Sequence, residues 1–252
     1  MTAQGVKEKA DGPASTVQDA EGSSDRQEPE FEEQGPYFSA SDEALLAKER
    51  DRILDIAEKH IRRIGHRKTT IADIASDLGT SRANVYRFFP TRAAIDNAVC
   101  GRILKAQTEI AFSIARTDAA ASKKLAQLLS VLHRHSRRML MEEKPVHELF
   151  VAATSENWAT INANSERMRA ILEGIIRQGV RSGEFQVENI DDAVQGAITA
   201  FLPFSHPVLV AQCFQGEDEI AASVNAQIRF IMRALDEPVS RPAEVSGALI
   251  TA

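Results

Sequence analysis

Apolar residues recur at every third or fourth position through most of the chain, and this spacing is typical of helices that bury one face. Glycines, prolines and capping residues interrupt the pattern and divide it into successive segments. We therefore expect an all-α fold. The segments predicted to be helical are about residues 39–64, 71–78, 81–89, 91–112, 119–135, a short one after 145, 155–182, 190–202 and 218–235.

The second and third of these segments are short, and together they have the pattern of a helix-turn-helix. Thr70, followed three residues later by Asp73, forms a capping box that opens the first helix. Gly79 permits the left-handed backbone of a sharp turn. Ser81 can then cap the second helix, and Pro90 discourages that helix from continuing.

The second helix of this pair presents two different faces. At about 100° per residue, Val85, Phe88 and Phe89 fall on one side, which is expected to pack on the other helices. The opposite side suits the DNA major groove, where arginine can bond guanine, asparagine can bond adenine and alanine allows a close approach. The side chains on that side are Arg82, Ala83, Asn84, Tyr86 and Arg87.

Charge favours DNA binding over an ordinary helical hairpin. Residues 50–92 hold ten basic and five acidic residues, a net charge of +5, whereas the whole chain has a net charge of −6. Because duplex DNA is a polyanion, a locally basic segment in an acidic chain is expected of a DNA-binding surface. Exposed arginines are also common as solvated charges, so a helical protein-interaction module without DNA binding is the alternative.

Four consecutive stretches, ILDIAEKHIRRIG, TIADIASDLG, TSRANVYRFF and PTRAAI, resemble the amino-terminal DNA-binding domain of TetR-type (TetR/AcrR) transcriptional regulators. The family usually has His where Phe88 stands and Lys where Arg92 stands. The resemblance implies a DNA-binding regulator, here expected to be a repressor. It also implies a three-helix amino-terminal helix-turn-helix domain, followed by a larger helical domain for dimerisation and effector binding.

Within this motif, base contacts would specify the operator and phosphate contacts would position the protein. We assign sequence preference to Arg82, Asn84 and Arg87. Lys68 lies beside the start of the first motif helix, where a phosphate would also meet free N–H groups. The full set of candidate DNA contacts is Lys68, Thr70, Ser81, Arg82, Ala83, Asn84, Tyr86, Arg87 and Arg92.

The later helices carry aromatic and long aliphatic residues that the DNA reader does not need. They form either ordinary core or, in part, the lining of an apolar cavity, and the sequence leaves both interpretations open. By resemblance, the cavity would hold a small, mostly apolar effector of unknown identity that releases the operator. Candidate lining residues are Phe112, Leu132, Phe150, Trp158, Met168, Leu172, Phe201 and Phe204.

The last two long helices, near residues 191–201 and 218–235, are expected to join two copies of the chain into a homodimer. One helix-turn-helix contacts few base pairs, so a pair on a palindromic double-stranded operator supplies the missing affinity. Ile228, on the apolar face of the last helix, is the expected interface residue.

Composition divides the chain into four parts. Residues 1–37 hold nine acidic and three basic residues with few large apolar ones, and we expect a disordered acidic tail there. Residues 38–97 form the predicted helix-turn-helix domain, with its motif at about 70–89. Residues 98–236 form the predicted dimerisation and ligand-binding domain, and residues 237–252 a loose tail.

Nothing in the sequence points to catalysis, a cofactor or a bound metal. Phosphate-cradling, nucleophile-elbow and zincin motifs are absent, and neither Cys100 nor Cys213 has a second ligand at metal-binding spacing. An all-α enzyme is therefore the weaker alternative. The chain lacks an apolar run of about 18 residues and a basic-then-apolar leader, which predicts a cytoplasmic protein without membrane contact.

Overall fold

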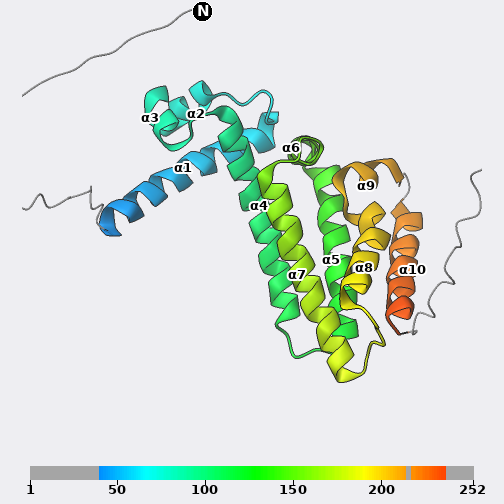
Figure 1. Cartoon of the computed structure of the whole chain (residues 1–252). Coiled ribbons are helices and arrows are strands. Elements are labelled where there is room, and N and C mark those ends of the chain that lie inside the picture. The colour runs from blue at the N-terminus through cyan, green and yellow to red at the C-terminus, as the bar shows by residue number, and fades with distance from the viewer. Residues whose placement is uncertain (1–39, 214–216, 237–252) are drawn as a thin grey trace, which may run out of the picture. The chain divides into compact units, whose positions relative to one another are not determined.

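The computed structural model describes residues 40–213 and 217–236, which form ten helices with no strand among them (Figure 1). The prediction of an all-α fold is therefore confirmed. The helices are α1 (Ala40–Ile64), α2 (Ile71–Leu78), α3 (Arg82–Phe88), α4 (Arg92–Ala115), α5 (Ala121–Glu142), α6 (Lys144–Ser155), α7 (Ala159–Ser182), α8 (Ile190–Ser205), α9 (Pro207–Cys213) and α10 (Glu217–Asp236).

One hydrophobic cluster, which we call the reader core, joins α1, α2, α3 and the first half of α4 to α6. Ile53 of α1, Ile74 of α2 and Val85 of α3 are completely buried in it. Val146 and Leu149 of α6 are completely buried in the same cluster. The helix-turn-helix is thus supported by a helix that lies much later in the sequence.

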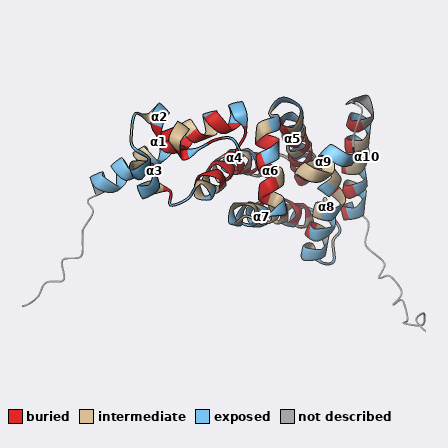
Figure 2. Ribbon diagram, turned by 90° about the horizontal axis from the view of Figure 1, so that it is seen from above, coloured by how far each residue is buried: buried red, intermediate tan, exposed pale blue. Residues whose placement is uncertain are grey.

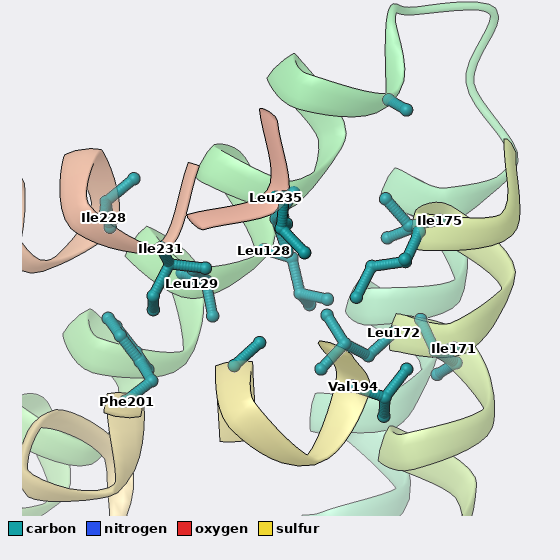
Figure 3. Close-up of a cluster of buried hydrophobic side chains, with 14 of the residues drawn as sticks. Leu128, Leu129, Ile171, Leu172, Ile175, Val194, Phe201, Ile228, Ile231 and Leu235 are labelled. Atoms are coloured by element: carbon teal, nitrogen blue, oxygen red, sulfur yellow. The ribbon is translucent and has the colours of Figure 1, made fainter. Parts of the chain in front are cut away.

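A second cluster, which we call the bundle core, is built by α5, α7, α8 and α10 with the end of α4. Figure 3 shows Leu128 of α5, Leu172 of α7, Val194 and Phe201 of α8 and Ile231 of α10 converging in it. Each such side chain contributes about 1.5–3 kcal/mol to folding when fully buried. In Figure 2 the buried residues line the facing sides of these helices, as the predicted periodicity requires.

Helix α4 belongs to both cores and crosses the predicted domain boundary after residue 97. Its residues Ile95 and Val99 are in the reader core, whereas Ala111 and Ile114 are in the bundle core. It packs closely along α7, because a Cβ placed on Gly101 would lie 2.7 Å from the Thr160 hydroxyl oxygen. A shift of α4 in one core would therefore also move the α4 residues that pack in the other core.

The apolar stripe of α1 is buried over only part of its length, although its spacing predicts burial from Leu45 to Ile64. Leu45 is 65% exposed, Leu46 is 40% exposed and Ile64 is 37% exposed. The prediction was wrong at both ends. The buried apolar residues of α1 all lie between Ile53 and Ile61, where α1 contacts α2, α4 and α6.

Several helix ends also differ from the sequence pattern. Helix α5 continues to Glu142 instead of ending near residue 135, and α7 begins at Ala159 instead of Ser155. Pro203 and Pro207 predict that α8 kinks or breaks; the helix continues past Pro203 and ends at Ser205, two residues before Pro207. Proline fits the first turn of the helix that follows, because the amide hydrogen it lacks would have no partner there.

The predicted acidic tail at residues 1–37 and the predicted loose tail at residues 237–252 lie outside the described residues. Among the helices that are described, none is both long enough and apolar enough to cross a membrane.

Candidate nucleic-acid interface and ligand cavity

The turn between α2 and α3 forms as the sequence predicts. The Thr70 hydroxyl oxygen accepts from the Asp73 amide at 3.2 Å, and the Asp73 carboxylate accepts from the Thr70 amide at 3.2 Å. The hydrogen bond from the Thr70 hydroxyl, at 2.7 Å, holds the pKa of Asp73 below its usual range. Gly79 has φ of +66°, and this left-handed conformation lets the Thr80 amide bond the Ala75 carbonyl at 2.9 Å.

Helix α3 begins at a serine cap, since the Ser81 hydroxyl oxygen accepts from the Asn84 amide at 3.2 Å. Its buried side consists of Val85, with Phe89 following at the cap. The exposed side carries most of the predicted base-reading set, and Asn84 is half-buried. The exposed residues are Arg82, Ala83, Tyr86 and Arg87.

Two of the predicted contacts are already engaged inside the protein. The Asn84 side-chain amide donates to the Thr80 hydroxyl at 3.1 Å, and its carbonyl accepts from Arg87 at 3.4 Å. Arg92 donates to the carbonyls of His66 and Thr69 in the linker before α2, the latter at 3.3 Å. Arg92 thus holds the linker, whereas Lys68 in that linker is exposed.

A buried polar cluster lies at the start of α4. Asp96 is 2% exposed and forms an ion pair with Arg92 at 3.1 Å. Burial raises the pKa of Asp96 to about 6, although Arg92 opposes the shift. His66 Nδ1 lies 3.8 Å from Asp96, which is too far for a hydrogen bond, and neither His66 nitrogen has a partner. Burial, with Arg92 and Arg67, lowers the pKa of His66, so we regard this contact as one between a neutral imidazole and a carboxyl group.

Sequence reasoning missed two residues that hold α2 and α3 on α1. Arg50 donates to the Phe88 carbonyl at 3.0 Å and lies over the Phe89 ring at 4.1 Å. His60 pairs with Asp77 of α2 at 2.9 Å. In the sequence, Arg50 is only one of ten basic residues in its segment. Its partner is a main-chain carbonyl, which no side-chain pattern can reveal.

A cavity of about 410 Å³ lies among α4, α5, α6, α7 and α8. Five of the eight predicted lining residues line it: Leu132, Phe150, Met168, Leu172 and Phe201.

The other three predicted lining residues lie outside the cavity lining. Phe112 is 42% exposed on α4, Trp158 packs against the reader core, and Phe204 packs on Phe201 and His133. The sequence predicts which helices are apolar, but which of their apolar residues meet the cavity depends on helix packing.

The cavity adjoins the reader core directly. Leu104 of α4, Met139 of α5 and Phe150 of α6 line the cavity and also belong to that core. A ligand that displaced any of these side chains would therefore press on the residues that support the helix-turn-helix.

No group of three or more metal-ligating side chains occurs among the described residues. Cys100 is buried in the reader core, and burial raises the pKa of its thiol to about 12, which suppresses the reactive thiolate. The described part of the chain thus presents a polar helix surface and a cavity, and the thiol of Cys100 is unreactive.

Two family models match the chain. The one described as "Bacterial regulatory proteins, tetR family" matches residues 53–99. The one described as "Tetracyclin repressor-like, C-terminal domain" matches residues 121–226. Together they cover well over half of the chain, and no curated protein matches it.

Solved structures share the fold. A transcriptional regulator from Cytophaga hutchinsonii is 18% identical, with a TM-score of 0.60, over 75% of this chain and 99% of the other. A transcriptional regulator from Saccharomonospora viridis, in complex with choline, is 24% identical, with a TM-score of 0.57, over 73% and 96%. FadR from Bacillus subtilis, in complex with stearoyl-CoA, is 20% identical, with a TM-score of 0.52, over 72% and 97%.

Proposed function

This chain belongs to the TetR family of DNA-binding transcriptional regulators, and we propose that it represses transcription as a dimer on a palindromic operator until a small, mostly apolar effector releases it. Regulators of this family are transcription factors, which argues against the all-α enzyme. The observation that carries the proposal is α3, which exposes two arginines, a tyrosine and an alanine on one side while its other side is anchored in the reader core.

The roles along α3 follow from this geometry. Arg82 and Arg87 can reach base edges in the major groove, where a bidentate contact to guanine discriminates by about 1–3 kcal/mol. Asn84 would have to exchange its bonds to Thr80 and Arg87 for bonds to a base. Tyr86 and Lys68 are exposed and suited to phosphates.

Dimerisation through α8 and α10 is supported by the surface between them. Small side chains of α8 and the aromatic ring of Phe230, which is 61% exposed on α10, line a pocket there. Exposed aromatic residues beside small ones favour close packing against a second copy. Ile228, the interface residue expected from the sequence, is instead 7% exposed and packs inside the protomer. That expectation was wrong.

Release by an effector is supported by the position of the cavity beside the reader core. An effector acts only if it binds the DNA-incompetent conformation more tightly, and such coupling is typically about 1–3 kcal/mol and reciprocal. The structural relatives from Saccharomonospora viridis and Bacillus subtilis were solved with choline and stearoyl-CoA respectively. Those ligands differ in size and charge, so they name no effector for this chain.

The test begins with duplex DNA selected by the full chain from a random pool. We expect the selected sequences to be palindromic and the affinity to fall steeply with salt, because phosphate contacts release counterions. Sedimentation should give two chains per duplex. If no sequence is enriched and binding does not depend on salt, the chain does not bind DNA as proposed, and the alternative of a helical protein-interaction module is favoured.

A further inference from the structure

The cavity has a polar end at the corner where α8 meets α9. Ser136 of α5, His147 of α6, and Ser205 and His206 at the corner itself line this end. Ser136 and His147 are among the few buried polar residues of the described chain, at 6% and 8% exposure. We call these four residues the polar end of the cavity.

Three of these side chains already use their hydrogens within the protein. The Ser136 hydroxyl donates to the Ser205 carbonyl at 2.8 Å, and the Ser205 hydroxyl donates to the Phe201 carbonyl at 3.3 Å. His147 Nε2 lies 2.9 Å from the Pro207 carbonyl, which can only accept, so this nitrogen carries the hydrogen. The atoms still able to bond a ligand are the two hydroxyl oxygens, His206 Nδ1 and His147 Nδ1. In a neutral imidazole, His147 Nδ1 is then an acceptor.

The four residues of the polar end include no carboxylate, lysine or arginine. Burial lowers the pKa of His206, so its ring is neutral at neutral pH, and its Nδ1 has no hydrogen-bond partner. The charged lining residues are Glu166 and Arg169 on α7, and Arg169 is engaged with Gln195 at 3.0 Å and Asp191 at 3.7 Å. A buried carboxylate or ammonium at the polar end would therefore lose its hydration without gaining a counter-charge from these four residues.

Apart from this end the lining is mostly apolar. Its other polar residues are Gln107, Thr154, Asn164, Ser165, Glu166, Arg169 and Gln195. Leucine, isoleucine, methionine and phenylalanine side chains from five helices surround the space. A volume of about 410 Å³ holds about a dozen non-hydrogen atoms, at the roughly 30 Å³ that a water molecule takes in the liquid.

We propose that this cavity binds an uncharged amphiphile of about a dozen non-hydrogen atoms, whose hydroxyl group donates a hydrogen bond at the polar end. The inference rests on the proposed function, since it names the chemical class of the effector. A hydroxyl group can donate to one of the acceptors at the polar end, and the alkyl or aryl body fills the remaining, mostly apolar space.

The experiment compares decanol, its isomer nonyl methyl ether and decanoate by calorimetry on the full chain at about pH 8, where decanoate is ionised. The alcohol and the ether have the same atoms, but only the alcohol can donate. We expect decanol to bind about tenfold more tightly than the ether, and decanoate to bind more weakly than decanol. Equal binding of the ether or of decanoate overturns the proposal, and so does a failure of decanol to bind.

Two variants locate the hydroxyl. The double variant Ser136→Ala/Ser205→Ala removes two acceptors at the polar end, and should reduce the preference for decanol over the ether several-fold. Ser165→Ala is the matched control, because Ser165 lines the cavity and donates to the Ile161 carbonyl of its own helix at 3.0 Å. If only Ser165→Ala reduces the preference, the assignment of the polar end is wrong. If the double variant does not fold, the comparison of probes on the unmodified chain still decides.

DNA binding separates this proposal from the proposed function. The affinity for the selected duplex is measured with and without decanol. If decanol binds with the expected preference but leaves DNA affinity unchanged, the proposed ligand class is supported, and the proposal that this ligand releases DNA is wrong. If other compounds release DNA while decanol and the ether bind equally, release by an effector is supported, and the proposed ligand class is wrong.

Discussion

Arg87 and Arg92 show how differently two arginines of one DNA-reading motif can be used. Arg87 is exposed on α3 with one long hydrogen bond to Asn84, so little has to be broken before it contacts a base. Arg92 holds two linker carbonyls and Asp96. A phosphate contact by Arg92 would require these bonds to open, so we propose that its main role is to position the linker before α2.

Replacing Arg87 by alanine should weaken binding to the selected duplex by about 1–3 kcal/mol if Arg87 makes a bidentate base contact. Fluorescence anisotropy on the duplex and on variants of each base pair measures both the loss and the position at which specificity relaxes. Arg167→Ala, an exposed arginine on α7, is the control and should leave affinity unchanged. Equal effects of the two variants would mean that α3 does not read bases.

Asp96 makes the stability of the reader depend on pH in an unusual direction. Its pKa rises from 3.8 to about 6 on folding, so ionisation opposes folding, and the stability cost develops as pH rises between those values. A shift of this size corresponds to about 3 kcal/mol. Urea unfolding should therefore show that Asp96→Asn gains stability relative to the unmodified chain between about pH 4 and about pH 7. A constant difference across that range would show that burial does not disfavour the carboxylate.

The helix-turn-helix could be predicted from the sequence because its determinants are local. The Thr70 capping box, the left-handed Gly79 and the Ser81 cap act within three or four residues of their partners. The anchors of Arg50 and Arg92 could not be predicted, because their partners are main-chain carbonyls that folding brings near. The cavity follows the same rule: its helices were predicted, and its lining was predicted in part.

Helix α5 has no side-chain cap of its own at its start, and a distant residue takes that place. The Glu184 carboxylate, in the connection after α7, accepts from the amides of Ala121 and Ser122 at 3.0 Å each and from the Ser122 hydroxyl at 2.8 Å. These bonds lower the pKa of Glu184 to about 2. Glu184 thus caps the start of α5 and ties it to the end of α7. Its position in the sequence does not indicate this role.

Glu184→Gln should lower the melting temperature at neutral pH. The glutamine side chain has one oxygen acceptor and one NH₂ donor, so it can no longer accept from both backbone amides at the start of α5, and it carries no negative charge to favour that helix end. The folded-state pKa of Glu184 is depressed, so its contribution is present above the ordinary value of 4.5 and is lost as pH falls towards 2. The difference between variant and unmodified chain should shrink over that interval. Glu188→Gln, exposed nearby, should show no such trend.

Two glycines of α7 provide a direct test of packing. A Cβ on Gly179 would collide with the buried ring of Phe185, whereas a Cβ on Gly174 would meet nothing within 4 Å. Gly179→Ala should therefore destabilise the chain by about 1–3 kcal/mol through overpacking. Gly174→Ala should stabilise it by up to about 1 kcal/mol, because alanine favours the helix. Urea unfolding measures both, and similar signs for the two would refute this account of Gly179.

At the scale of the whole molecule, Phe230 distinguishes the proposed dimer from a monomer. Phe230→Asp places a charge on the surface between α8 and α10 without touching the bundle core, so light scattering should detect folded monomers with reduced operator affinity. Leu45→Asp is the matched control, since Leu45 is 65% exposed on α1, away from that surface. If both variants remain dimers, the interface lies elsewhere.

Helix α4 is not the only described helix that borders both the cavity and the reader core, because α6 does so too. Phe150 has the cavity on one side and the reader core on the other. Leu104 of α4 has the same double position. Two helices, rather than one, can therefore carry a change in the cavity to α2 and α3.

The membership of α6 in the reader core also limits how such regulators can be recombined. A chimera joined within α4, at the predicted boundary after residue 97, would set one parent's Ile53 and Ile95 against the other parent's Val146 and Leu149. Their shapes would have to fit by chance, because interiors are packed at crystal density. The exchangeable unit of this protein is therefore discontinuous in sequence, and a transplanted DNA reader keeps its stability only if α6 is transplanted with it.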